Sequence, residues 1–253
     1  MESKYKYNEA TVKFYDLVYE KLADKGRFAF YQEEISKSKG PVLEAGAGTG
    51  MIFVPALKNG ADIYGIDHSE YMFKALRSKL DEKDHHRISL QDIREFKLEK
   101  KFNLIISPFR VFQHLITIED QLQALGRIYE HLENEGLFIF DLFCPDTNRL
   151  KTEVNNDLEF EGEFEPGKKA RRYATVIPDY INQVQNVTFK YVWDSDNGEQ
   201  MSEYSFPMRY YFRFEIMNLL KLAKFKVKHF YGDFRRSKLS NSSKEFVIVC
   251  SKL

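Results

Sequence analysis

Cysteine and tryptophan are scarce in this sequence of 253 residues, which holds two cysteines and one tryptophan. Cys144 and Cys250 lie far apart, and neither has a second cysteine at the C-x-x-C spacing of zinc and redox motifs. A disulfide framework and a zinc site are therefore excluded, and two small buried apolar side chains are the expected alternative. We expect no bound metal.

Net charge and long hydrophobic runs are also lacking. Thirty-eight basic residues balance 38 acidic ones, which argues against a dedicated nucleic-acid binder. No apolar run has the length of a membrane span, and residues 1–7 lack the apolar core of a signal peptide. We therefore expect a cytoplasmic protein that does not bind membranes. The terminal Ser251-Lys252-Leu253 matches a peroxisomal address but follows an apolar strand-like run too closely for a receptor to grip.

Short apolar runs and helical patterns alternate through the first 150 residues. Strands are predicted at 41–45, 61–67, 87–92, 102–107 and 136–142, with helices at 51–58, 69–80 and 118–132 between them. Such alternation implies parallel strands joined by right-handed crossovers. The predicted fold is α/β, a doubly wound (Rossmann-like), mostly parallel sheet of seven strands with an antiparallel β insertion.

The pattern changes after residue 150. Antiparallel strands are predicted near 158–164, 170–177, 184–193 and 203–211, and Asp196-Asn197-Gly198 is a hairpin turn signal. We divide the chain into a cofactor-binding core with N-terminal helices (1–151), an insertion that forms a lid or a dimer surface (152–212), and a helix with the last core strands (213–253). The aromatic insertion could pair two subunits in a homodimer.

The most informative stretch is VLEAGAGTG at 42–50, where three alternate glycines follow a strand and precede a helix. Such glycines let the backbone turn sharply and approach a ligand closely. Three acids, Glu44, Asp67 and Asp92, stand at the ends of successive predicted strands. Glu44 would repel a pyrophosphate but would attract an ammonium or a sulfonium. This disfavours an NAD-dependent dehydrogenase, the nearest alternative enzyme.

These residues resemble a known family. The glycine run, Asp67 with the following His68-Ser69 and Met72, the Asp92-Ile93 step, and the Gln113-His114-Leu115 turn together look like class I S-adenosylmethionine-dependent methyltransferases. Their order is similar to the small-molecule branch, which includes glycine N-methyltransferase-like and amino-sugar N,N-dimethyltransferase-like enzymes. The resemblance covers residues 8–150 and, less closely, the last strands. It implies S-adenosyl-L-methionine as cofactor and a small-molecule methyl acceptor.

The resemblance also implies roles for individual residues. Glu44, Gly46, Ala47 and Gly48 would bind the methionine end of the cofactor, Asp67 the ribose, and His68, Met72, Asp92 and Ile93 the adenine. Ser107 and the turn up to Arg110 would line the transfer site, and Tyr15 and Tyr19 would close over the cofactor.

Methyl transfer from a sulfonium is an in-line displacement that releases a neutral thioether and needs no acid. Its main requirement is orientation, with a base only where the acceptor, an N or O atom, arrives protonated. His114 is the candidate base, and helix capping or packing against the cofactor are its other interpretations. An RNA-modifying methyltransferase that uses the basic C-terminal region and a non-catalytic cofactor-binding subunit remain open alternatives.

Overall fold

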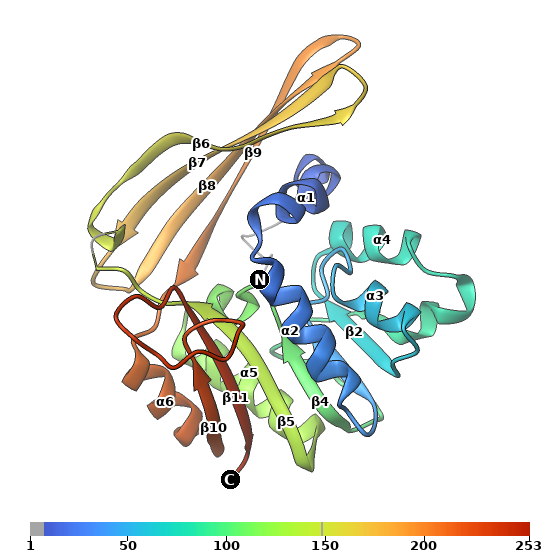
Figure 1. Cartoon of the computed structure of the whole chain (residues 1–253), viewed down its shortest axis with the longest axis vertical. Helices are drawn as coiled ribbons and strands as arrows, with labels where there is room; N and C mark the ends of the chain where they lie inside the picture. The colour runs from blue at the N-terminus through green and yellow to red at the C-terminus, as the bar shows by residue number, and fades with distance from the viewer. Residues whose placement is uncertain (1–7, 148) are drawn as a thin grey trace. The chain divides into compact units, whose positions relative to one another are not determined.

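The chain divides into two compact units in the computed structural model, which describes residues 8–147 and 149–253 (Figure 1). One unit joins the segment ending at Ala23 with Asp146–Arg209, and the other joins Asp24–Pro145 with Tyr210–Leu253. The predicted absence of a signal peptide at 1–7 lies outside the described residues.

A seven-stranded sheet forms the centre of the second unit. Its strands are β1 (Val42–Ala45), β2 (Ile63–Asp67), β3 (Ile88–Leu90), β4 (Phe102–Ser107), β5 (Leu132–Phe143), β10 (Phe225–Tyr231) and β11 (Glu245–Lys252). They lie in the order β10-β11-β5-β4-β1-β2-β3. Strands β1 to β5 pair in parallel with their neighbours in this order, whereas β11 pairs antiparallel with both β5 and β10. The predicted Rossmann-like fold is confirmed.

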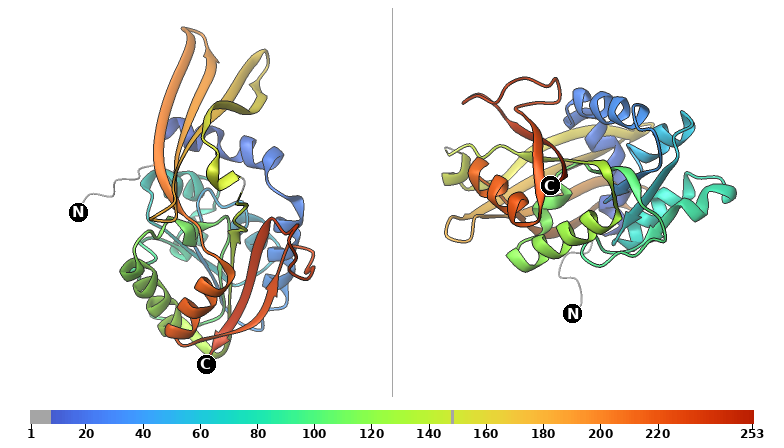
Figure 2. Two further views of the ribbon diagram at one scale, coloured as in Figure 1. Left: turned by 90° about the vertical axis from the view of Figure 1, so that its left-hand side faces the viewer. Right: turned by 90° about the horizontal axis from the view of Figure 1, so that it is seen from below.

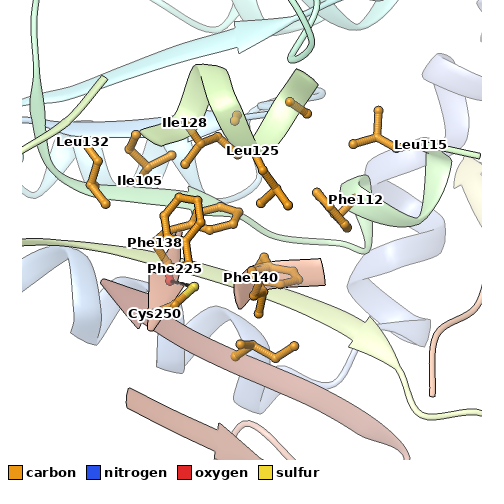
Figure 3. Close-up of a cluster of buried hydrophobic side chains, with 14 of the residues drawn as sticks. Ile105, Phe112, Leu115, Leu125, Ile128, Leu132, Phe138, Phe140, Phe225 and Cys250 are labelled. Carbon is orange, nitrogen blue, oxygen red and sulfur yellow. Dashed lines mark hydrogen bonds between the residues drawn. The ribbon is translucent and has the colours of Figure 1, made fainter. Parts of the chain in front are cut away.

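Helices cover both faces of this sheet (Figure 2). They are α2 (Lys25–Ser36), α3 (Phe53–Lys58), α4 (Glu70–Ser78), α5 (Ile118–His131) and α6 (Arg213–Leu222), with the 3-10 turns η1 (Glu82–Arg87) and η2 (Val111–His114). On one face, α5 and α6 pack on an aromatic core that includes Phe112, Phe138, Phe140 and Phe225 (Figure 3). On the other face, side chains of α2, α3 and α4 form a second core with the strands.

The first unit is a four-stranded antiparallel sheet with one helix. Strands β6 (Val154–Glu165), β7 (Lys168–Asp179), β8 (Val184–Ser195) and β9 (Gly198–Arg209) pair in sequence order, and η3 (Arg149–Lys151) precedes them. Helix α1 (Glu9–Leu22) is capped by Asn8, whose side chain accepts from the Thr11 amide. Its Phe14 and Val18 pack against side chains of β6, β7 and β8.

Several element ends differ from the predicted ones. Strand β3 ends at Leu90, so Asp92 lies in the following turn rather than in the strand. Strands β6, β7 and β8 run further than predicted, and their ladders continue into charged ends whose side chains pair across strands. Examples are Lys169 with Glu161 at 3.2 Å and Lys168 with Asp196 at 2.9 Å.

Candidate functional site

The glycine loop lies at the carboxyl end of β1, where the sheet order reverses between β1 and β4. In open α/β sheets ligands bind at this switch point. Gly46, Gly48 and Gly50 all have positive φ, at 88°, 54° and 87°. The amides of Gly46 and Ala47 both donate to the Ile66 carbonyl at 2.9 Å, which fixes the loop against β2.

Two of these glycines are required by packing within the protein, and the third is not. A Cβ on Gly46 would lie 2.5 Å from Cγ2 of Val111, and a Cβ on Gly50 would lie 2.5 Å from Cδ1 of Leu76. A Cβ on Gly48 would meet nothing within 4 Å. The open space over Gly48 is therefore the part of the loop that a ligand can approach.

Glu44 is buried in β1, with 2% of its surface exposed, and its Oε2 has no hydrogen-bond partner. Burial, reinforced by the charge of Asp67, raises the pKa of the Glu44 carboxyl well above its ordinary value. An unpaired buried carboxylate is unfavourable unless a cation or a donor binds it. The site thus has a vacant acceptor suited to an ammonium group.

Asp67 ends β2 and is held by backbone amides. Its Oδ2 accepts from the Gly48 amide and its Oδ1 from the Ser69 amide, both at 2.8 Å. Burial raises the pKa of Asp67, although these amides and the nearby His68 oppose the rise. Asp67 therefore connects the glycine loop to the start of α4, and its remaining lone pairs can accept further hydroxyl donors.

Asp92 is already engaged by a neighbour. Arg94 donates to Oδ1 through Nε at 2.9 Å and to Oδ2 through Nη2 at 2.7 Å, and it also contacts Asp120 at 3.0 Å. Burial would raise the pKa of Asp92, but the hydrogen bonds from Arg94 outweigh it and the pKa is lowered. Asp92 is thus an ionised hydrogen-bond acceptor. The amine of an adenine base would have to share its carboxylate with Arg94.

The other predicted adenine contacts lie on the segments that follow β2 and β3. His68 is exposed beside Asp67, Met72 is 2% exposed on α4, and Ile93 is half-buried next to Asp92. Ala47 is 5% exposed within the glycine loop. These positions all lie near the same edge of the sheet, as the parallel strand directions require.

Ser107 ends β4 beside the glycine loop. Its hydroxyl donates to the Ala45 carbonyl at 3.0 Å, and the residue is fully buried. The Ser107 side chain therefore ties β4 to β1, so any contact with a ligand at this position falls to the backbone.

His114 ends η2 and is half-buried. Burial, with a smaller contribution from His68, lowers its pKa to about 4. The imidazole is consequently neutral at pH 7 and a weak base. Its role as a catalytic base stays a prediction.

Tyr15 belongs to the other compact unit, where its ring contacts the Tyr19 ring at a tilt of 37° with centroids 4.4 Å apart. Its contact with a cofactor stays a prediction. Within the described ranges 8–147 and 149–253, no group of three or more His, Cys, Asp or Glu side chains could hold a metal ion. No helix in those ranges is both long and apolar enough to span a membrane.

Sequence reasoning missed the charged residues behind the β4 turn. Arg27, Asp141 and Glu245 come from α2, β5 and β11 and are largely buried. The segments that carry Arg27 and Glu245 lie 218 residues apart in sequence, and no local pattern connects them. The one available signal was the polar Asp141 within the apolar run of β5.

Comparison with known proteins places residues 42–136 in a family described as "Methyltransferase domain". A putative methyltransferase, YqeM, of Bacillus subtilis is 22% identical over 243 residues, which are 93% of this chain and 94% of the relative. A malonyl-[acyl-carrier protein] O-methyltransferase of Ilyobacter polytropus is 29% identical, with 59% of this chain and 58% of the relative covered.

A third relative is the dTDP-3-amino-3,4,6-trideoxy-alpha-D-glucopyranose N,N-dimethyltransferase of Streptomyces venezuelae. It is 30% identical over 100 residues, which are 40% of this chain and 41% of the relative. The chain thus spans 58% and 41% of the lengths of these last two relatives. Among solved structures, an S-adenosylmethionine-dependent methyltransferase from Clostridium acetobutylicum has a TM-score of 0.77 at 17% identity, over 94% of this chain and 97% of that one.

Proposed function

We propose that the chain is an S-adenosylmethionine-dependent methyltransferase that methylates the nitrogen of a small-molecule amine. The match of residues 42–136 to the methyltransferase domain and the N,N-dimethyltransferase relative support this proposal. The observation that supports the cofactor most directly is the buried Glu44 carboxylate, whose Oε2 has no partner, beside the open space over Gly48. An α-ammonium group would satisfy this oxygen.

Each part of the site has a task in this proposal. Glu44 and the glycine loop hold the amino-acid end of the cofactor, and Asp67 accepts from the ribose hydroxyls. His68, Met72, Asp92 and Ile93 surround the base. When bound, S-adenosylmethionine would supply a methyl carbon activated by a positive sulfur, to which an amine lone pair could be directed. The surrounding residues then need only orient the acceptor and exclude water.

The N,N-dimethyltransferase relative favours nitrogen over oxygen as acceptor, and the lowered pKa of His114 agrees with this choice. An imidazole with a pKa of about 4 is a poor base for removing a proton from an alcohol. A neutral amine already presents its lone pair and loses its proton to solvent after transfer. His114 is then positioned to contact the amine rather than to ionise a hydroxyl.

Calorimetric titration with S-adenosylhomocysteine tests the cofactor. Wild-type protein should bind saturably, and Asp67→Ala should abolish binding, because it removes the acceptor that also fixes the Gly48 amide. Glu70→Gln, on the exposed face of α4, is the control and should bind normally. Absence of binding to the wild type would refute the proposal.

A mass-spectrometric assay with a trideuteromethyl-labelled cofactor tests the acceptor. Matched panels of primary amines, including amino sugars and amino acids, and the corresponding alcohols should show label on the amines only. Label on the alcohols alone would instead assign O-methylation. Cofactor binding with no product from either panel would favour a non-catalytic partner subunit.

A further inference from the structure

The turn that follows β4 has an uncommon backbone. Phe109 and Arg110, two successive residues with side chains, have φ of 58° and 64°. This left-handed region is disfavoured for residues other than glycine, so such a turn persists only where its surroundings hold it in place. The question is which contacts do so.

The Phe109 end is held by a fully buried carboxylate. Asp141, near the carboxyl end of β5, accepts at Oδ1 from the Phe109 amide at 3.1 Å and from the Tyr31 hydroxyl at 2.7 Å. The Phe109 ring lies 4.9 Å from the Arg27 guanidinium and packs edge-on against Phe28. Both the backbone and the side chain of Phe109 are therefore fixed.

The Arg110 end is held by a second acid. Arg110 Nη2 donates to Oε1 of Glu245 at 2.6 Å, and the same oxygen accepts from Arg27 Nη2 at 3.3 Å. Arg27 Nη2 also lies 3.5 Å from Oδ2 of Asp141. The ion pairs form one chain, Arg110–Glu245–Arg27–Asp141. It begins at Arg110 of the turn and ends at Asp141, which accepts from the Phe109 amide of the same turn.

The turn leads directly into η2. The Arg110 carbonyl accepts from the Gln113 amide at 2.9 Å, and η2 carries both Val111 and His114. Val111 is the residue that packs against Gly46 of the glycine loop. Because η2 begins directly after the turn, the conformation of the turn sets where His114, at the far end of η2, stands.

A buried ionic chain is a costly way to gain stability, because apolar residues of similar volume would do as well without desolvating charges. Directional contacts can, however, select one backbone arrangement. Asp141 and Glu245 contact the turn at an amide and at a guanidinium, and neither contact could be made by a methyl group.

We propose that Arg27, Asp141 and Glu245, together with the Arg110 side chain, are positioning residues that hold the left-handed Phe109–Arg110 turn in the conformation required for methyl transfer. This rests on the proposed function and on the expectation, from the family resemblance, that the turn up to Arg110 lines the transfer site. None of the four side chains is proposed to take part in the chemistry.

Glu245→Gln tests the proposal, because it keeps the side-chain shape and removes the charge. We expect kcat to fall about ten- to a hundredfold, as for a reacting group displaced by about 1 Å. The S-adenosylhomocysteine Kd should stay within about threefold of wild type, since the interaction lost acts on turnover rather than on cofactor binding. Amide exchange in peptides covering 107–115 should be about tenfold faster.

Two further variants make the result specific. Arg110→Met removes the other half of the ion pair and leaves Glu245 paired with Arg27, so it should fold and reproduce the fall in kcat and the faster exchange. Glu34→Gln is the matched control. Glu34 lies on the same helix as Arg27 and is similarly shielded from solvent. It pairs with Arg236 at 2.5 Å and takes no part in the ion pairs of the turn. It should change none of the three readouts.

Wild-type kcat and exchange rates in both Glu245→Gln and Arg110→Met would overturn the proposal. A loss of S-adenosylhomocysteine binding that accompanies the fall in kcat would also overturn it, because the ion pairs would then support the whole site. If the wild type proves inactive on every acceptor, the proposed function fails, and exchange at 107–115 still decides whether the ion pairs hold the turn.

Discussion

Glu44 shows how a single residue can serve binding at the expense of stability. Its carboxyl is buried, has one oxygen without a partner, and lies near the second acid Asp67. The ionised form of Glu44 is therefore unfavourable in the unliganded protein. A cationic ligand group would remove this penalty on binding.

Glu44→Gln should consequently stabilise the unliganded protein and weaken cofactor binding. Because the folded-state pKa of Glu44 is raised, its contribution to stability is most favourable below the unfolded value and is lost as pH rises through the folded one. We expect a gain of about 1 kcal/mol at pH 8 that shrinks towards pH 4. The free energy of unfolding in urea at both pH values measures it.

The affinity of the same variant for S-adenosylhomocysteine should fall about tenfold or more, or about 1.4 kcal/mol. Glu70→Gln controls for the loss of a surface carboxylate and should change neither quantity. A Glu44 variant that is less stable than wild type at pH 8 would mean that the carboxylate has a partner within the protein.

At the scale of elements, the strand-loop-helix unit around β1 separates packing from binding. Gly46 and Gly48 are two residues apart and both have positive φ, yet only Gly46 has protein atoms where a Cβ would stand. A pair of alanine substitutions can therefore distinguish the two demands on the loop.

Gly46→Ala should cost about 2–4 kcal/mol of unfolding free energy, because backbone strain adds to the clash with Val111. Gly48→Ala should cost only about 1–2 kcal/mol, the backbone term alone, but should abolish S-adenosylhomocysteine binding. Denaturation curves and calorimetry measure the two effects. Adding Val111→Ala should recover part of the Gly46 loss and none of the Gly48 defect; recovery of both would show that Gly48 is also packed.

The elements themselves were predictable because their signals are local. Strand β4 was predicted with the observed ends, and the helix predicted at 69–80 corresponds to α4. The glycine loop was predicted from its spacing. The turn at Phe109 was not, because its left-handed backbone is held by Asp141 and Glu245 from distant strands, and sequence periodicity carries no information about such contacts.

At the scale of the whole molecule, the chain is built from two units that each draw on separate stretches of sequence. Helix α1 joins the antiparallel sheet through Phe14, whose ring lies 5.5 Å from Trp193 and 6.0 Å from Tyr191. The amphipathic pattern of α1 identifies its apolar face but not the surface that covers it, so the sequence alone does not assign α1 to one unit.

Phe14→Ala should destabilise this unit selectively, by about 3–5 kcal/mol, since it removes a large, fully buried side chain. Trp193 is the sole tryptophan of the sequence, so its fluorescence reports on the antiparallel sheet. We expect its urea midpoint to fall while amide exchange in β4 and β5 stays slow. Phe214→Ala, at a residue that is 70% exposed on α6, is the control. If Phe14→Ala reduced amide protection in β4 as much as in the antiparallel sheet, the two units would not unfold independently.

The pairing of α1 with the antiparallel sheet also constrains how a newly made chain can mature. A ribosome delivers α1 first, yet Phe160, Ala170 and Tyr191, which cover its apolar side, emerge only after β1 to β5 have been translated. Until then the nascent helix exposes Phe14 and Val18, the kind of surface that chaperones bind. Truncated products that end before residue 160 would keep that surface uncovered.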